Sequence, residues 1–486
     1  MNSFFARLER NGAKIALQDS TTTLTYIQLS NRVNALAEWL VASNVRSIAL
    51  LADNSVEWVV TDLACQKAQV VCTPIPVFFT HQQSQAIITS VAAEFLFSSQ
   101  EDSGIAREHC DYTALNVTRL QPQANLLVPP LTSKVTYTSG STGTPKGVCL
   151  SAEQQHTVAR SLAEFIGINQ PQHLCLLPLP VLLENVAGVY APLLAGGSLI
   201  LASQEERGFS GSTLTNPKNL LECIETNQPN TLILVPELLQ VLVRAAGHGW
   251  QPPKTLQFVA VGGSRVAPTL IQRARAIGIP VVQGYGLSEC ASVVSLCAPD
   301  DDVSSVGQIL PHLSARLENS ELVVSGNTFL GYLEQPDSWH QHEVHTGDVA
   351  QLKGNQLAII GRRKNTLINS LGRNISPEWV EAEILATGLF FQAVVVGDAM
   401  PFCTAILVPA RRDLSAAHID QVIAMVNQGL PDYARVYHPI IQFNPMQPEE
   451  GLYTQNMRPR RAAIYQHFKQ QIQRVYASTS TVEQAL

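Results

Sequence analysis

Apolar residues recur along the first part of the chain with two different spacings. Leu29, Val33, Leu36 and Leu40 follow the period of a helical turn, so they predict an amphipathic helix with one apolar stripe. The apolar run 47–52 then predicts a buried strand, and the Asp-Asn-Ser sequence after it is a helix N-cap signal. These patterns predict a helix, a buried strand and a second helix in succession.

The same alternation continues to about residue 300. Strand-like apolar runs cover 68–76, 231–235, 256–261 and 280–283, and helix-length segments separate them. Strands that alternate with helices favour parallel sheets covered by helices. The sequence therefore predicts an α/β fold, with a large N-terminal domain of helix-covered sheets.

The pattern changes after residue 303. Short strand-like pieces at 321–324 and 356–360 stand among frequent glycines, which predicts a small β-rich subdomain. Beyond residue 361 the elements are smaller in scale and predict a small α+β domain. We place the boundary at the start of this region, so the predicted domains are 1–363 and 364–486.

Composition and charge exclude several classes of protein. Apolar residues make up 45% of the chain and charged residues 15%, which excludes a disordered chain. The formal net charge of −7 gives no general attraction to nucleic acid or to anionic membranes. No apolar run reaches about 18 residues, so no transmembrane segment is expected. Nine scattered cysteines without a CxxC pair indicate free thiols in a reducing compartment, which predicts a cytoplasmic location.

The strongest chemical signal is a loop rich in glycine and hydroxyl residues. Residues 137–148 read YTSGSTGTPKGV. Glycine lets backbone N–H groups converge on an anion, hydroxyls add donors, and Lys146 supplies a positive charge. Pro145 before the lysine and Gly147 after it break the Walker phosphate-loop pattern. Composition alone fits a phosphate-binding loop and an ordinary surface loop equally well.

This loop resembles the phosphate loop of the adenylate-forming superfamily, which includes acyl-CoA synthetases, luciferases and peptide-synthetase adenylation domains. Further motifs stand in the family's order: QGYGLSE at 283–289, HTGD at 345–348, GRRKN at 361–365 and GRNISP at 372–377. The resemblance spans nearly the whole chain. It implies that ATP and a carboxylate form an acyl-AMP with release of pyrophosphate, and that the acyl group then passes to a thiol. It also implies a mobile C-terminal lid domain that rotates about a hinge near Lys364.

The resemblance assigns roles to single residues. Glu289 matches the glutamate that helps to hold Mg²⁺, a cation suited to carboxylate and phosphate oxygens. Tyr285 matches the aromatic residue that stacks on adenine, and Ser288 matches a hydroxyl near the α-phosphate. Asp348 matches the aspartate that accepts hydrogen bonds from both ribose hydroxyls, and Arg362 matches an arginine on the ribose side. Without the resemblance, ordinary core or surface roles would be favoured for these residues.

Backbone and loop residues complete the predicted nucleotide site. Gly262 and Gly263 follow an apolar run and resemble the loop between adenine and the acyl pocket, where glycine permits close approach. Gly286 belongs to the motif that carries the adenine-stacking tyrosine. The predicted phosphate-loop residues are Thr138, Ser139, Gly140, Ser141, Thr142, Gly143 and Lys146.

Two positions depart from the family pattern. Val181 stands where many members carry a histidine near the carboxylate, so Glu184 or backbone groups would replace it, or the reaction proceeds without it. Arg458 stands where the family carries the lysine that bridges the substrate carboxylate and the α-phosphate. We favour a working catalytic Arg458, and the alternatives are slow adenylation or a catalytic Arg460 or Arg461.

The segment 177–195, LPLPVLLENVAGVYAPLLA, is almost entirely apolar, as an acyl-binding wall or a buried packing helix would be. It looks most like bacterial medium- to long-chain fatty acyl-CoA synthetases. No insertion follows Asn365, which favours CoA over a phosphopantetheine carrier. The leading hypothesis is a fatty acyl-CoA synthetase that uses ATP, Mg²⁺ and CoA. The alternatives are an acyl-AMP ligase that loads a carrier protein and a catalytically weakened nucleotide- or acyl-adenylate-binding protein.

Overall fold

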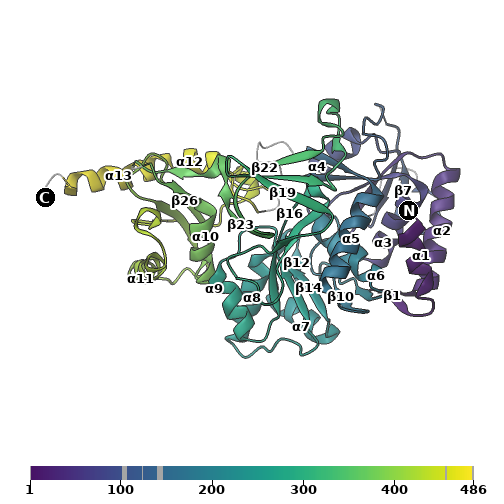
Figure 1. Cartoon of the computed structure of the whole chain (residues 1–486), viewed down its shortest axis with the longest axis horizontal. Coiled ribbons are helices and arrows are strands. Elements are labelled where there is room, and N and C mark those ends of the chain that lie inside the picture. The colour runs from purple at the N-terminus through teal and green to yellow at the C-terminus, as the bar shows by residue number, and fades with distance from the viewer. Residues whose placement is uncertain are drawn as a thin grey trace.

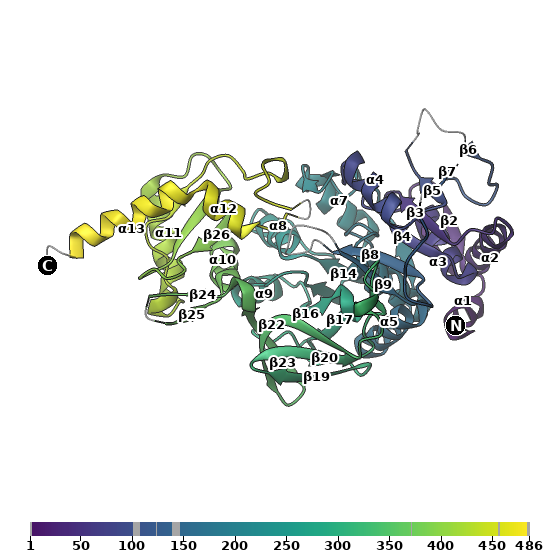
Figure 2. The same ribbon diagram turned by 90° about the horizontal axis from the view of Figure 1, so that it is seen from above.

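A computed structural model describes residues 2–100, 107–122, 124–138, 146–370, 372–454 and 457–483. A large α/β body carries the N-terminus, and a smaller domain coloured light green to yellow extends to one side of it (Figures 1 and 2). The C-terminal helix projects from the far end of this smaller domain. The predicted fold class is confirmed.

One long sheet crosses the N-terminal domain, and within the described residues it contains 13 strands. In spatial order they are β19 (Leu313–Glu318), β20 (Glu321–Gly326), β22 (Glu343–Lys353), β23 (Gln356–Arg362), β18 (Gln308–Ile309), β17 (Ser292–Leu296), β16 (Val281–Leu287), β15 (Phe258–Val261), β14 (Thr231–Leu234), β10 (Gln172–Leu174), β11 (Ser198–Ile200), β1 (Ile15–Gln18) and β2 (Thr23–Thr25). The strands β10, β14, β15 and β16 are parallel, whereas β16 pairs antiparallel with β17. The predicted β-rich subdomain is therefore an antiparallel continuation of the main sheet.

A second sheet holds the strands on either side of the phosphate loop. Its order is β21 (Gly331–Tyr332), β9 (Lys146–Leu150), β8 (Lys134–Thr138), β4 (Val71–Pro74), β3 (Ser47–Leu51), β5 (Phe95–Ser98), β7 (Asn116–Arg119) and β6 (Arg107–Glu108). The strands β3, β4, β5 and β8 pair in parallel, and the apolar runs 47–52 and 68–76 predicted β3 and β4. The strands β8 and β9 form an antiparallel pair, with Thr138 opposite Lys146. This pairing brings the two ends of the phosphate loop together.

Helices cover both sheets. In the N-terminal domain they are α1 (Asn2–Arg10), α2 (Tyr26–Ala42), α3 (Val56–Ala68), α4 (His81–Ser90), α5 (Ala152–Ile166), the π-helix η1 (Glu184–Tyr190), α6 (Ala191–Leu194), α7 (Pro217–Asn227), α8 (Pro236–Ala246) and α9 (Pro268–Ala276). The apolar stripe predicted for residues 29–40 is the buried face of α2. Helix α3 begins after Ser55, whose side chain accepts a hydrogen bond from Trp58 N at 3.2 Å, so the predicted N-cap is confirmed.

The C-terminal domain is small and α+β. It contains β24 (Leu367–Ile368), β25 (Asn374–Ile375), α10 (Pro377–Ala386), β26 (Phe390–Val396), β27 (Thr404–Pro409), α11 (Ala416–Gln428), β28 (Ile440–Ile441), α12 (Arg461–His467) and α13 (Lys469–Glu483). The 3₁₀ turn η4 (Arg363–Asn365) connects it to β23, at the predicted boundary. The exact domain limits and the hinge motion stay predictions.

The structure bears on two further expectations from the sequence. Among the described residues, no helix combines the length and the apolarity that crossing a lipid bilayer requires. All nine cysteines lie within the described residues, and none forms a disulfide. A cytoplasmic location stays a prediction.

A buried histidine in α5 makes stability depend on pH. His156 stacks on Phe4 with ring centroids 4.2 Å apart, and its Nε2 lies 2.8 Å from Gln66 Oε1. Burial, together with the positive charge of Lys134, lowers the pKa of His156 to about 3. The unfolded chain binds a proton at this residue near pH 6.5, so stability is lost as the pH falls below that value.

We expect the free energy of unfolding to fall by about 2 kcal/mol between pH 6.5 and pH 5 because of His156. His156→Gln should remove this part of the pH dependence, and His418→Gln, on α11, is the matched control. Urea unfolding followed by circular dichroism at both pH values measures the effect. An unchanged pH dependence in His156→Gln would show that the buried histidine is not its source.

Candidate active site

A cavity of about 210 Å³ lies between the main sheet and the segment predicted to form an apolar wall. The sheet contributes residues of β14, β15 and β16, and α5 adds Leu162 and Ala163. From the predicted wall come Val181, Leu182, Leu183, Ala187, Ala191, Pro192 and Ala195. The segment therefore packs as a buried helical layer and lines a cavity at the same time.

The predicted glycine loop and tyrosine motif border this cavity. Gly262, Gly263, Tyr285, Gly286 and Ser288 are among its lining residues. A Cβ on Gly262 would lie 3.1 Å from the carbonyl oxygen of Gly284, and a Cβ on Gly286 would lie 1.8 Å from that of Ser292. Glycine is therefore needed at Gly286, where the antiparallel neighbour leaves no room for a side chain.

A chain of polar contacts joins the tyrosine to the predicted ribose site. The hydroxyl of Tyr285 donates to Asp348 Oδ2 at 2.6 Å, and Arg362 Nε donates to Asp348 Oδ1 at 2.8 Å. Arg362 also donates to the carbonyl of Thr346 at 2.9 Å. Burial raises the pKa of Asp348, although Arg362 and the tyrosine hydroxyl oppose the shift. The three predicted residues are thus brought together, and stacking of Tyr285 on adenine stays a prediction.

A second group of contacts brings Lys146 and Glu289 together through Tyr332. Lys146 Nζ lies 4.7 Å from the centre of the Tyr332 ring, and the Tyr332 hydroxyl donates to Glu289 Oε1 at 2.8 Å. Tyr332 belongs to none of the sequence motifs, and its only local signal is the preceding Gly331. Tyr332 lies near Lys146 because β21 pairs with β9, which places Tyr332 opposite Val148.

The predicted phosphate contacts are only partly visible. Lys146 begins β9, and Thr138 ends β8. Ser139, Gly140, Ser141, Thr142 and Gly143 lie outside the described residues, so their contacts with phosphate stay predictions.

Arg458 reaches from the C-terminal domain to the glycine loop. Its Nη2 donates to the carbonyl of Gly263 at 2.8 Å, across 195 positions of sequence. Its own backbone exchanges hydrogen bonds with Thr454, whose N–H donates to Arg458 O at 2.8 Å and whose Oγ1 accepts from Arg458 N at 3.1 Å. Arg458 is therefore held at the edge of the cavity.

The two other candidate arginines are placed differently. Arg461 forms a two-pronged ion pair with Glu381, at 2.8 and 2.6 Å, inside the C-terminal domain. Arg460 is exposed to solvent. Of these three arginines, Arg458 is the one that the structure places at the cavity.

The predicted hinge residue lies between the two domains. Partial burial lowers the pKa of Lys364, and the neighbouring charge of Arg362 acts in the same direction. Beside it, Arg363 donates to Glu321 Oε2 at 2.8 Å, and Asn365 donates to Glu378 Oε1 at 2.6 Å. These contacts anchor the connecting turn to both domains.

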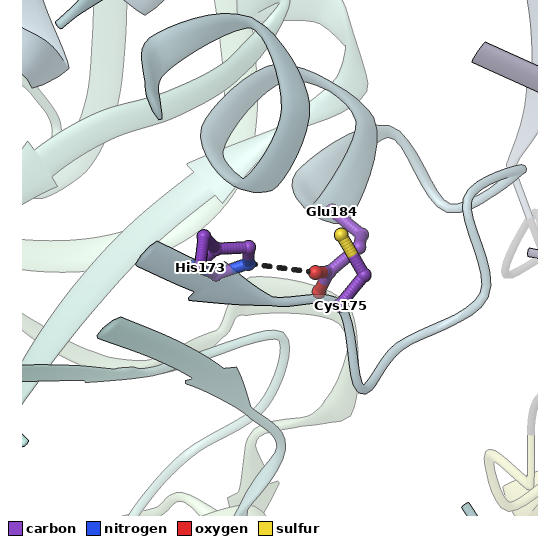
Figure 3. Close-up of side chains that lie close together, drawn as sticks. All are labelled: His173, Cys175 and Glu184. Carbon is purple, nitrogen blue, oxygen red and sulfur yellow. Dashed lines mark hydrogen bonds and ion pairs between the residues drawn. The ribbon is translucent and has the colours of Figure 1, made fainter. Parts of the chain in front are cut away.

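The structure argues against Glu184 as the replacement for the histidine that many family members carry in place of Val181. Val181 lines the cavity, but Glu184 is fully buried behind its wall and lies 3.0 Å from His173 Nε2 (Figure 3). Cys175 lies beside this pair, and the three side chains offer possible metal-ligand atoms within 4.8 Å of one another. The carboxylate of Glu184 is therefore hydrogen-bonded to His173, and Glu184 is not among the residues that line the cavity.

Models of known protein families match both domains of this chain. The model of the AMP-binding enzyme family matches residues 4–333, and the model of the AMP-binding enzyme C-terminal domain matches 364–480. The chain is 24% identical over 478 residues to a 2-succinylbenzoate–CoA ligase of Staphylococcus aureus, which covers 88% of this chain and 93% of the relative.

Solved structures show the same fold. An o-succinylbenzoate CoA synthetase of Bacillus subtilis, in complex with its acyl-adenylate intermediate, matches with a TM-score of 0.75 and 20% identity over 95% of this chain and 97% of that one. The anthranilate CoA ligase AuaEII, in complex with anthranoyl-AMP, matches with a TM-score of 0.79 and 17% identity over 95% and 96% of the two chains. These relatives are not fatty acyl-CoA synthetases, so a fatty acid substrate stays a prediction. Because the family model covers more than half of its length, this chain belongs to the AMP-binding enzyme family.

Proposed function

We propose that this enzyme activates a carboxylic acid with ATP, releases pyrophosphate, and transfers the acyl group from AMP to the thiol of CoA. The observation that carries the proposal is the contact between Arg458 and Gly263, which brings a cation of the C-terminal domain to a residue that lines an apolar cavity. The similarity to acid–CoA ligases over most of the chain supports the same reaction.

Charge neutralisation and positioning are the main demands of the first step, because a carboxylate must approach the α-phosphate of ATP. In the proposed reaction Arg458 bridges these two anions. A carboxylate oxygen attacks the α-phosphorus, and pyrophosphate leaves. Asp348, held by Tyr285 and Arg362, offers acceptor oxygens for the ribose hydroxyls, and Lys146 contributes positive charge beside the departing phosphates.

Glu289 fits the predicted magnesium site. A carboxylate has two acceptor oxygens, and the Tyr332 hydroxyl occupies one of them while holding the side chain in place. When bound, Mg²⁺ would neutralise phosphate charge in this region. The chain's own contribution is to hold Glu289, Tyr332 and Lys146 in one cluster.

The cavity suggests the class of acid. Apart from a few polar groups its described lining is apolar, and it includes no lysine or arginine. A second carboxylate, such as the one that succinylbenzoate keeps after activation, would meet no cation there. We therefore propose an acid with an apolar body. The named relatives favour an aromatic acid, and a medium-chain fatty acid is the second candidate.

We expect purified protein with ATP, Mg²⁺ and CoA to form equal amounts of AMP, pyrophosphate and acyl-CoA from an aromatic or fatty acid. Mass spectrometry of reactions with aromatic, fatty and amino acids measures the products. Acyl-AMP that accumulates and ignores CoA would indicate a carrier-protein acceptor instead. ATP binding without product from any acid would contradict the synthetase and support a weakened binding protein.

Arg458→Ala should lower the rate of adenylation about a hundredfold, since it removes a preorganised cation from the reacting anions. The transfer from supplied acyl-AMP to CoA should change much less. The matched control is Arg460→Ala, because Arg460 is exposed two positions away. Equal losses in both half-reactions would argue for a structural role of Arg458. A faster Arg458→Lys variant would show that arginine slows the native enzyme.

Tyr332→Phe should lower the adenylation rate about tenfold at low Mg²⁺, because Glu289 loses the hydroxyl that orients it. The contact between Lys146 and the aromatic ring is kept in this variant. Measuring pyrophosphate release across a Mg²⁺ titration separates this effect from general loss of activity. Tyr112→Phe is the control, since Tyr112 is 43% exposed. An unchanged Mg²⁺ dependence in Tyr332→Phe would contradict the assigned role.

A further inference from the structure

The cavity has a polar end that the proposed reaction does not use. His173 on β10, Thr231 on β14 and Phe258 on β15 are direct partners in neighbouring parallel strands, and all three line the cavity. Along β15, Phe258 lies three residues before Val261, which corresponds to about 10 Å of strand. The reacting end begins just after Val261, at Gly262. This row of three residues, which we call the floor row, is therefore distant from the site of adenylation.

Two hydrogen bonds connect the floor row to the buried carboxylate. Thr231 Oγ1 lies 2.9 Å from His173 Nδ1, and His173 Nε2 lies 3.0 Å from Glu184 Oε1. Glu184 is fully buried, and His173 and Thr231 are 1% and 6% exposed. Figure 3 shows the histidine and glutamate pointing toward each other from β10 and η1. Burying three polar side chains is costly unless each is hydrogen-bonded, so this arrangement needs a reason.

Part of the reason is attachment of the π-helix to the sheet. A Cβ on Gly188 would lie 2.6 Å from Glu184 Oε1 and 2.7 Å from His173 Nε2, so glycine lets the helix lie close to the pair. This role needs only the bond between His173 and Glu184. The backbone of β14 also pairs with β10, and the Thr231 hydroxyl completes the hydrogen bonding of His173 at Nδ1 while Thr231 lines the cavity.

The direction of the hydrogen bonds determines what Thr231 offers to a ligand. With a neutral imidazole beside a carboxylate at Glu184, His173 would carry its proton on Nε2 and accept at Nδ1. Thr231 then donates its O–H to His173 Nδ1. The lone pairs of Thr231 Oγ1 then stay free to accept a hydrogen bond from a group in the cavity.

We propose that Thr231, positioned by His173 and Glu184, binds a hydroxyl or amino group on the end of the acid that lies farthest from its carboxylate. This inference rests on the proposed function and narrows its substrate class to apolar acids with a distal hydrogen-bond donor. His173 and Glu184 act through Thr231 and are positioning residues. A site built around a hydrogen bond disfavours an analogue that lacks the donor, because the buried acceptor is left unpaired.

Matched pairs of acids test the inference. The probes are 3-phenylpropanoate with 3-(4-hydroxyphenyl)propanoate, and octanoate with 8-hydroxyoctanoate. We expect the hydroxylated member of at least one pair to have a kcat/KM about tenfold higher in ATP–pyrophosphate exchange. Thr231→Val should abolish that preference, and Thr231→Ser, which keeps the hydroxyl, should retain it. Thr61→Val, at a buried threonine of α3, controls for the loss of a hydroxyl elsewhere.

Calorimetric binding of the same acids, without ATP, separates this inference from the proposed function. Preferential binding of a hydroxylated acid that Thr231→Val loses would support the inference even if no AMP forms, and the missing AMP would then contradict the synthetase. Equal or weaker binding of both hydroxylated acids would overturn the inference while leaving adenylation intact. Binding of one equivalent of a transition metal by the protein, but not by His173→Phe, would also overturn the inference. His173 Nε2 would then be a metal ligand and would not donate a hydrogen bond to Glu184.

Discussion

The rest of the site depends on the backbone pairing of β16. This strand is parallel to β15 on one edge and antiparallel to β17 on the other, and its register shifts between Tyr285 and Gly286. The shift is possible because Gly286 has no side chain to meet the Ser292 carbonyl. Ligand sites of α/β sheets lie at the carboxyl ends of parallel strands, and here the end of β15 meets this change of pairing.

Around that point the polar groups are held by partners from distant parts of the chain. Asp348 lies between Tyr285 and Arg362, Glu289 is held by Tyr332, and Arg458 reaches Gly263. Groups fixed in this way need little rearrangement when charge develops during a reaction, which is the basis of electrostatic preorganisation. In the proposed reaction the acid would fill the apolar cavity beside them, and the exclusion of water would strengthen the same interactions.

Some charged residues are bound in buried pairs that stabilise the fold, and these differ from the residues proposed to act in the reaction. Arg461 lies three positions after Arg458, but it is bound to Glu381 inside the C-terminal domain. Glu184 is likewise bound to His173 behind the cavity wall. Removing one partner of such buried pairs leaves an uncompensated charge, so these residues are constrained by stability as well as by function.

The sequence alone determined the α/β class, the helix and strand positions with strong periodicity, and the motifs of the predicted nucleotide site. These depend on local patterns, such as the stripe of α2 or the glycines around Tyr285, which need no long-range contact to be recognised. Only the tertiary structure decided which arginine reaches the cavity, that Tyr332 joins Lys146 to Glu289, and that Glu184 turns toward His173. Each of those contacts depends on strand pairing or domain placement, and the local sequence around a residue does not specify its partner in space.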